Sequence, residues 1–303
     1  MVDVSSGDVD GMRDSSVADL IDDLNAKQAR LPLGPVLGLG ASAIGLGLLA
    51  VLANARPGSA GAGVGAFALL AAIPAWAIGV WLDQSLRRSV LFYNLDAEAA
   101  AKFQRATAEF DALAGCKGKW HIQSGGVVRD LATWKRNAGA AHIVDRKSAL
   151  LAYSLPTVLR SNVTPPALGM GRRTFYFFPE VIIVQDGRKF GAVGYGELEI
   201  RWQQSRFIED GHPPNDAQVV DHTWEHPNKS GGPDRRFKDN RRLPVCLYDV
   251  MHMSSRSGMN ELAEFSKVGV VERFAAALRE LPRQPASKSL LAFAPNATLV
   301  HTS

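Results

Sequence analysis

Two uncharged, apolar runs dominate the first third of the chain. Residues 31–54 contain no charged side chain, and a second uncharged run at residues 57–82 follows closely. A helix needs about 20 apolar residues to cross roughly 30 Å of hydrocarbon. We therefore expect two transmembrane helices that form a hairpin over residues 31–83, joined by a short turn.

Glycine and alanine recur at helical spacing within both runs. The Gly-Leu-Gly at residues 38–40 has the spacing of part of a phosphate-binding loop, but such a loop follows a strand and opens a helix. The flanks here are apolar, so we interpret the small residues as helix-packing positions. These positions are Gly34, Gly38, Ala41, Gly45, Ala68, Ala72, Ala75 and Gly79. We expect the two faces to pack on each other inside the hairpin; packing between subunits of a homo-oligomer is the alternative.

The cations that flank the two runs predict which side of the membrane each end occupies. Lys27 and Arg30 precede the first run, and Arg87 and Arg88 follow the second, whereas Arg56 is the one cation between the runs. Lys and Arg accumulate in the cytoplasmic segments that flank membrane spans. Both termini are therefore expected in the cytoplasm, in a multi-pass protein of the cytoplasmic (inner) membrane of a bacterium.

Amphipathic helices are expected on both sides of the hairpin. The acidic segment 1–30 has an apolar stripe at helical spacing, made by Val17, Leu20, Ile21 and Leu24. The juxtamembrane segment 84–116 is predicted to contain a helix that starts at an Asp96 cap and ends at Gly115. The apolar stripe of this second helix consists of Phe103, Ala106, Phe110 and Leu113. We interpret it as a helix that covers a sheet; a stalk is the alternative.

Strand-like patterns dominate residues 117–282, the expected cytosolic domain. Strands are predicted at residues 174–184, 190–195, 198–202, 218–224 and 245–253. Asp186-Gly187 predicts a hairpin turn, and Pro179 predicts a bend within the first strand. Residues 127–134 fit a short helix.

The end of this domain reads as a turn followed by a helix. The serines within residues 254–257 predict the turn, and the apolar stripe of residues 266–281 predicts an amphipathic helix that ends at Pro282. Residues 283–303 are expected to form a flexible tail. The predicted fold class is therefore an α+β membrane protein, in which an antiparallel, β-rich domain with a C-terminal helix follows the transmembrane hairpin.

Several antiparallel strands and one terminal helix form the plan of pleckstrin-homology-like domains. The chain resembles bacterial members of that family over residues 173–281, through an aromatic strand, a hairpin with a glycine turn and an edge from Tyr195 to Leu198. The resemblance implies a strongly bent sheet with the helix at one open end, and a domain that binds lipid or protein. Residues 210–243 are long for this plan and form an insertion.

The insertion concentrates basic side chains, which are Lys229, Arg235, Arg236, Lys238, Arg241 and Arg242. Arginine forks suit phosphate oxygens, and Gly231 and Gly232 free backbone N–H groups to face an anion. We expect a site for a lipid phosphate, a nucleotide, RNA or a protein; a solvated loop with internal Arg–Asp pairs is the alternative. His222 and His226 have chelating spacing on a helix, but their neighbours indicate a strand, so no metal site is expected.

Charge and cysteine content narrow the function further. The net charge is +4, and residues 1–30 hold seven Asp against three Lys or Arg (−4), so the rest of the chain carries about +8. A basic excess beside a membrane suits anionic head groups. Two cysteines, Cys116 and Cys246, are too few for a disulfide framework or a zinc–cysteine site.

The sequence contains no nucleophile elbow, Walker loop or kinase motif. We therefore expect a non-enzymatic, membrane-anchored sensor or scaffold that binds a ligand, a lipid or a protein in the cytosol without a cofactor. Two alternatives stay open. One is an effector whose two transmembrane helices oligomerise and permeabilise the membrane on sensing a signal. The other is a membrane-tethered hydrolase or nuclease.

Overall fold

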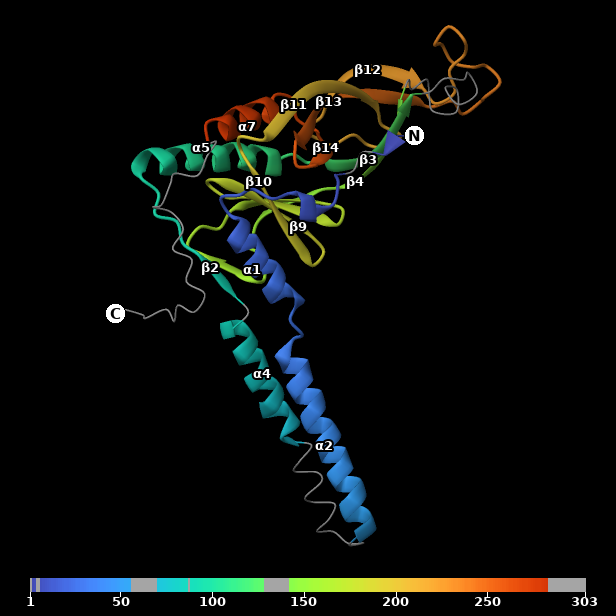
Figure 1. The fold of residues 1–303 in the computed structure, drawn as a ribbon. Helices are drawn as coiled ribbons and strands as arrows, with labels where there is room; N and C mark the ends of the chain where they lie inside the picture. Colours follow the sequence, from blue (N-terminus) through green and yellow to red (C-terminus); the bar gives the residue numbers. More distant parts are fainter. Residues whose placement is uncertain (1, 4–5, 56–69, 87, 128–141, 283–303) are drawn as a thin grey trace. The chain divides into compact units, whose positions relative to one another are not determined.

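A computed structural model describes residues 2–3, 6–55, 70–86, 88–127 and 142–282 of the chain (Figure 1). Its contacts divide the chain into two compact units. The β-rich unit contains the described residues of 1–21, 92–155 and 162–282, and the helical unit contains those of 22–91 and 156–161. The chain is an α+β protein, as its sequence patterns predict.

The helical unit holds two apolar helices. Its elements are most of α1 (Ala18–Ala29), α2 (Leu33–Ala55), α4 (Ala72–Leu86) and the parallel strand pair β2 (Ser89–Leu91) and β6 (Leu159–Ser161). The helical stretch Ala18–Leu48 is long and apolar enough to cross a membrane by length and composition, which suggests membrane association. The shorter apolar helix Ala72–Asp83 lies in α4, and residues 56–69 of the predicted second span lie outside the described residues.

Small residues lie where α2 and α4 approach each other most closely. A Cβ atom added to Gly79 of α4 would lie 2.6 Å from the Leu33 carbonyl oxygen and 2.7 Å from the Gly34 Cα. One added to Gly38 of α2 would lie 3.1 Å from the Trp76 Cβ. Of the predicted packing residues, Gly34, Gly38, Gly45 and Gly79 are buried, Ala41, Ala72 and Ala75 are half-buried, and Ala68 lies outside the described residues. Gly34, Gly38 and Gly79 therefore lie at contacts between α2 and α4.

Large apolar side chains cover the remaining surface of the same two helices. The exposed ones are Val36, Leu37, Leu39, Ile44, Leu46, Leu48 and Val51 on α2, and Ile73, Trp76, Ile78 and Trp81 on α4. Only 11% of the most apolar window of Ala18–Leu48 is buried. A helix pair in water shows the opposite arrangement, because burial of large apolar side chains drives its packing.

The described part of the β-rich unit contains two antiparallel sheets. The seven-stranded sheet has the order β1-β3-β14-β13-β11, with β4 paired to β3 and β12 paired to β13. Its strands are β1 (Val2–Asp3), β3 (Lys119–Val127), β4 (His142–Ser148), β11 (Leu198–Ile208), β12 (Gln218–Trp224), β13 (Arg242–Ser255) and β14 (Asn260–Phe265). The five-stranded sheet has the order β10-β9-β8-β7-β5. Its strands are β5 (Leu150–Tyr153), β7 (Pro166–Met170), β8 (Arg173–Phe177), β9 (Val181–Asp186) and β10 (Lys189–Gly194).

Two strand predictions are wrong in detail. Residues 174–184 form two strands, β8 and β9, which pair around a turn at Pro179 where the Phe178 N–H donates to the Val181 carbonyl at 3.0 Å. The serine turn at 254–257 leads into β14, whereas the terminal helix α7 (Val270–Arg279) begins later. Buried Glu261 and Glu264 make β14 look polar in sequence, so its strand character depends on partners far away in the chain. The turn at Asp186-Gly187 is confirmed, with a Gly187 φ of +60°.

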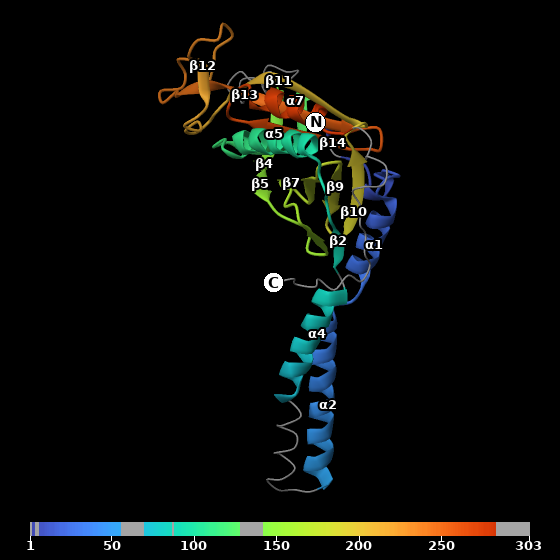
Figure 2. The ribbon, with the colours of Figure 1, turned by 90° about the vertical axis from the view of Figure 1, so that its left-hand side faces the viewer.

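Helices α5 (Ala97–Ala114) and α7 lie side by side and complete the core of the β-rich unit (Figures 1 and 2). The Asp96 side chain caps α5 by accepting the Ala99 N–H at 2.7 Å, as predicted. The rings of Phe110 on α5, Phe177 on β8 and Phe274 on α7 meet with centroid separations of 5.5–6.3 Å. The helix before residue 116 therefore packs on the sheets and is not a stalk. The short helix predicted at residues 127–134 lies outside the described residues apart from Val127, which ends β3.

Candidate functional site

Arg146 connects the two ends of the strand row β4-β3-β14-β13-β11. It lies on β4, yet its Nη2 atom donates to both carboxylate oxygens of Glu209, at 2.8 Å each, just after β11. Its guanidinium also lies 4.2 Å from the ring centroid of Trp120 on β3 and 3.9 Å from that of Phe207 on β11. Strands at opposite ends of a row meet in this way only if the sheet is strongly curved.

Two further side chains fill the inner face of this curved sheet. Tyr248 on β13 donates its hydroxyl hydrogen to Glu209 Oε1 at 2.7 Å, and Glu264 on β14 places Oε2 3.5 Å from Arg146 Nη1. Both are almost fully buried. The 3.5 Å contact is an ion pair without hydrogen-bond geometry, because neither atom has a hydrogen-bond partner among the described residues. We call Trp120, Arg146, Phe207, Glu209, Tyr248 and Glu264 the Arg146 cluster.

The Arg146 cluster holds two carboxylates against one guanidinium. Burial raises the pKa of Glu264 to about 7, and the nearby charge of Glu209 adds to this, although Arg146 opposes it. Burial, with the hydrogen bond to Glu209, also raises the pKa of Tyr248 far above its usual value. A carboxyl group with a pKa near neutrality exchanges its proton within the physiological pH range, which is common at functional sites.

A cavity of about 330 Å³ borders the Arg146 cluster. Its lining residues are Lys117, Gly118, Lys119, Trp120, Ser148, Ala149, Glu209, His212 and Pro214. The volume lies at the lower end of small-molecule sites, and such sites combine an aromatic wall with a few polar groups. Glu209 supplies a hydrogen-bond acceptor, whereas two lysines, a serine and a histidine supply donors. The lining therefore combines an aromatic wall with hydrogen-bond donors and an acceptor.

Gly118 is required for the wall of this cavity. A Cβ atom at that position would lie 2.1 Å from the Cη2 atom of the Trp120 indole. The indole also stacks on Arg146, so it cannot move away without opening the contact between β4 and β11. The Gly118 N–H donates to the Ser266 hydroxyl at 2.9 Å, which fixes the segment that carries the cavity.

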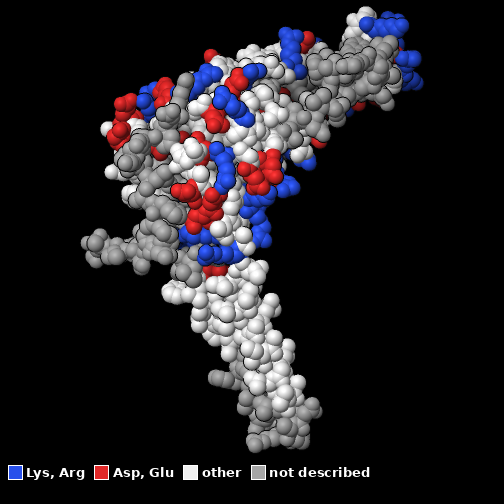
Figure 3. Space-filling model, in the orientation of Figure 1, with Lys and Arg blue, Asp and Glu red and all other residues white. Residues whose placement is uncertain are grey.

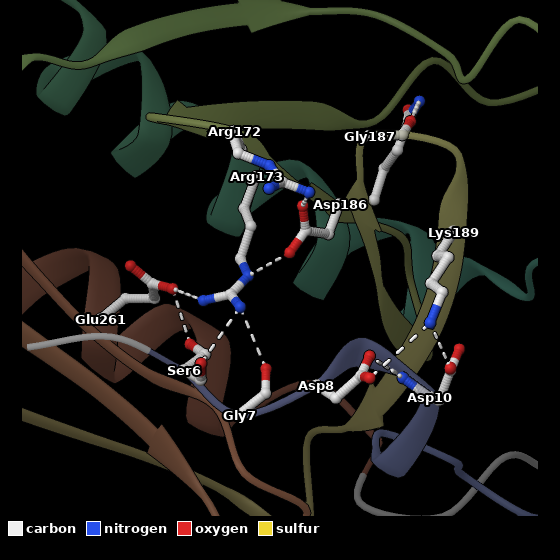
Figure 4. Close-up of polar contacts among 11 residues, drawn as sticks. Ser6, Gly7, Asp8, Asp10, Arg172, Arg173, Asp186, Gly187, Lys189 and Glu261 are labelled. Atoms are coloured by element: carbon white, nitrogen blue, oxygen red, sulfur yellow. Dashed lines mark hydrogen bonds and ion pairs between the residues drawn. The ribbon is translucent and has the colours of Figure 1, made fainter.

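A second polar network fixes the N-terminal segment to both sheets (Figure 4). Residues 6–13, which include the short 3₁₀ helix η1 (Val9–Gly11), cross the β-rich unit, and Met12 accepts the Ala192 N–H at 2.7 Å. The Arg173 guanidinium on β8 donates to Glu261 Oε1 at 2.9 Å, to Asp186 Oδ2 at 3.1 Å, and to the carbonyl oxygens of Ser6 and Gly7 at 3.1 and 3.0 Å. The sequence pattern did not predict this segment, because its contacts are not periodic.

Glu261 is the buried centre of this second network. Burial opposes its ionisation, but contacts from His121, Ser6 and Arg173 outweigh burial and hold its pKa below the usual value. Its Oε2 atom lies 2.9 Å from the His121 Nε2, and its Oε1 accepts the Ser6 hydroxyl at 2.6 Å. This ionised, fully paired carboxylate joins β14, β8 and the N-terminal segment, which is a structural role.

The predicted basic residues of the insertion are all exposed, but they do not act alike. Arg236 pairs with Asp234 at 2.6 Å, and Arg241 pairs with Glu225 at 2.8 Å and Asp210 at 2.9 Å. The internal pairing that the sequence allowed as an alternative therefore accounts for these two arginines. The other four, Lys229, Arg235, Lys238 and Arg242, have no ion pair with another described residue.

The two histidines of the insertion do not form a chelate. His222 lies on strand β12, as its neighbours predict, and the His226 ring stacks on Phe237 with a centroid separation of 3.9 Å. Across the residues that the structure describes, no group of three or more His, Cys, Asp or Glu side chains is arranged to hold a metal ion.

Comparison with protein-family models, curated proteins and solved structures gives no match for this chain. The resemblance to pleckstrin-homology-like domains therefore stays a prediction. The Arg146 cluster was missed at the sequence level, because Arg146, Glu209 and Glu264 are separated by more than fifty residues each. The one signal for this cluster in the sequence was an acidic residue within a buried strand, Glu264 of β14, which pairs with Trp120 of β3. The same polar side chain made the strand itself difficult to predict.

We expect the stability of the protein to fall as the pH rises from about 4.5 to 7, through Glu264. The unfolded chain loses this proton near 4.5 and the folded chain near 7, so in this window the folded state binds more protons and loses stability with pH. The difference corresponds to about 3 kcal/mol at 1.36 kcal/mol per pKa unit. Denaturant unfolding of the detergent-solubilised protein at several pH values measures it.

The matched control is Glu264→Gln, which has the shape of the protonated acid and does not titrate. The variant should be more stable than the wild type above pH 7 and should lose most of the pH dependence in this window. If the free energy of unfolding of the two proteins changed equally with pH, Glu264 would be ionised in the folded state well below neutrality.

Proposed function

We propose that this protein is a non-enzymatic, membrane-anchored binding protein. In this proposal α2 and α4 form a two-helix transmembrane hairpin, and the β-rich unit is a cytosolic pleckstrin-homology-like domain that binds a ligand, lipid or partner protein. The observation that carries the proposal is the inverted packing of the two helices. Gly34, Gly38 and Gly79 lie between them, and large apolar side chains cover their outer surface.

The outer surface of these helices suits lipid as the solvent. No Lys, Arg, Asp or Glu occurs in residues 31–55 or 70–82, and the corresponding surface in Figure 3 carries none. In water, each exposed Leu or Ile would forfeit about 1.5–3 kcal/mol that burial provides. The cations Lys27, Arg30 and Arg88 at the ends of the helices favour the orientation with both termini in the cytoplasm.

The β-rich unit supports the binding role through its curvature and its cavity. The curved antiparallel sheet, closed by Arg146 and followed by the terminal helix α7, agrees with the plan that the resemblance implies. The cavity beside Glu209 offers a place for a small polar ligand. The oligomerising effector and the hydrolase or nuclease stay predictions from sequence. Contact of the small-residue faces within one chain favours the anchor over the oligomer.

Extraction of the full-length protein from membranes tests this proposal. The full-length protein, expressed in a bacterium, should stay in the membrane pellet after washing with alkaline carbonate and should be released by detergent. A two-helix anchor buries enough apolar surface to resist a wash that removes peripheral proteins. A truncated chain starting at Phe92 would not serve as the control, because Ser6 and Met12 belong to the β-rich unit. Recovery of the full-length protein in the carbonate supernatant would overturn the proposal.

The insertion is proposed as the contact with an anionic partner. Lys and Arg side chains gather at the tip of the arm that carries β12 (Figure 3). Because Arg236 and Arg241 are already paired, replacing the four other cations should have the larger effect. The set is Lys229, Arg235, Lys238 and Arg242.

We expect the fourfold Gln variant of this set to lose at least tenfold in affinity for an anionic probe, such as short RNA or phosphatidylglycerol vesicles added to the nanodisc-embedded protein. Cations near an anionic surface contribute about 1 kcal/mol each. The matched control is Arg236→Gln with Arg241→Gln, which should change affinity little. Equal affinity of the fourfold variant and the wild type for every probe would leave the insertion as a solvated loop.

A further inference from the structure

We propose that Arg88 and Arg160 together bind the phosphate group of an anionic phospholipid in the leaflet that surrounds the anchor. The inference rests on the proposed membrane insertion of α2 and α4, and it assigns a site that the basic insertion does not include. Both arginines belong to the helical unit.

The backbone of the helical unit places these two arginines beside the end of an apolar helix. Arg88 follows the last residue of α4, Leu86, by two positions and directly precedes β2. Arg160 lies on β6, opposite Val90 of β2 in a parallel pairing. Residues at the end of a membrane-spanning helix lie at the depth of lipid head groups.

Contacts from α1 and β6 hold this position in place. The Lys27 ammonium on α1 donates to the Arg88 carbonyl oxygen at 3.2 Å and to the Ser89 hydroxyl at 3.3 Å. The Ser89 N–H donates to the Val158 carbonyl oxygen at 2.8 Å, next to the start of β6. The strand pair is therefore fixed by hydrogen bonds at its start, so that the two guanidinium groups extend from a defined backbone.

Two nearby carboxylates, those of Asp23 and Asp83, contact groups other than the two arginines. Asp23 pairs with Lys27 at 2.8 Å and accepts the Ser89 hydroxyl at 2.5 Å. Asp83 Oδ2 caps α2 by accepting the Leu33 N–H at 2.7 Å. In the described part of the chain, no carboxylate forms an ion pair with Arg88 or Arg160.

The two arginines therefore place two positive charges near each other, and neither forms an ion pair with a carboxylate of the described residues. Arg160 lies opposite Val90, two positions after Arg88. Partial burial and the charge of Arg160 both lower the pKa of Arg88, because like charges repel each other. A phosphate group would relieve this repulsion, because guanidinium forks bind phosphate oxygens with two parallel hydrogen bonds. The apolar surface of α4 alongside favours a phosphate that carries acyl chains over a free one.

The test compares lipid binding by the full-length protein and its variants in neutral detergent micelles. The probe is fluorescently labelled phosphatidylglycerol, added at increasing mole fraction to micelles that contain phosphatidylcholine. We expect Arg88→Gln with Arg160→Gln to weaken binding about thirtyfold, which two juxtamembrane cations would provide. The single variant Arg160→Lys keeps the charge and loses the fork, so it should weaken binding by a smaller factor.

Arg256→Gln is the matched control, because Arg256 is an exposed arginine of the β-rich unit and its loss makes the same change in charge. It should bind the lipid as the wild type does. The double variant must keep the wild-type melting temperature in phosphatidylcholine micelles; if it does not, Arg160→Lys alone decides the result.

Three outcomes would overturn the lipid site. They are equal binding by the double variant and the wild type, equal loss in the Arg256→Gln control, and competition by inorganic phosphate at millimolar concentration, which would mean a soluble anion site. Failure of the membrane anchor is distinguishable, because it appears as release of the wild-type protein by carbonate.

Discussion

Replacing Gly79 by alanine should separate α2 from α4 and destabilise the helical unit. The added Cβ would lie 2.6 Å from the Leu33 carbonyl oxygen and 2.7 and 2.8 Å from backbone atoms of Gly34. These are backbone atoms of the facing helix, so no side chain can rotate away and the helices must move apart. Overpacking of a close contact costs about 1–3 kcal/mol.

The matched controls for this substitution lie on the facing helix. Cβ atoms added to Gly40 or Gly47 of α2 meet nothing within 4 Å among the residues that the structure describes, so Gly40→Ala and Gly47→Ala should leave stability unchanged or slightly higher. Thermal unfolding in detergent, followed by the helical circular dichroism signal, measures all three variants. If Gly79→Ala unfolds at the same temperature as Gly47→Ala, then α2 and α4 do not pack through this face in the membrane.

Replacing Arg146 by methionine should destabilise the β-rich unit by about 3–5 kcal/mol at pH 8. The substitution keeps much of the packing between Trp120 and Phe207 but leaves the carboxylates of Glu209 and Glu264 buried without a cation. Removing one partner of a buried ion pair is costly because the remaining charge stays desolvated. Denaturant unfolding of the full-length protein in detergent provides the measurement.

The effect of Arg146→Met should depend on pH and on its partner. At pH 5.5, where the folded protein binds a proton on Glu264, the loss should be smaller, because only the charge of Glu209 is left uncompensated. Adding Glu209→Gln to Arg146→Met should restore part of the stability. Arg206→Met, an exposed arginine on the same strand as Phe207, is the control. A loss no greater than that of the control would mean that Arg146 does not close the sheet.

The sequence alone determined the features that depend on residue periodicity. The uncharged runs predicted the apolar helices α2 and α4, and two of the glycines singled out by their four-residue spacing, Gly34 and Gly38, lie at contacts with α4. The Asp96 cap and the turn at Gly187 were also predicted in place. Such features follow from interactions between residues a few positions apart, so that the local pattern contains the information.

Only the tertiary structure decided which distant residues meet. It brought Arg146, Glu209 and Glu264 together, turned the polar segment of Glu261 into strand β14, and fixed the N-terminal segment through Arg173. Each of these contacts joins residues far apart in the chain, and each buries a charge that the sequence alone would place in water. Burial of each of these charged groups becomes favourable only because folding brings a partner charge into contact with it.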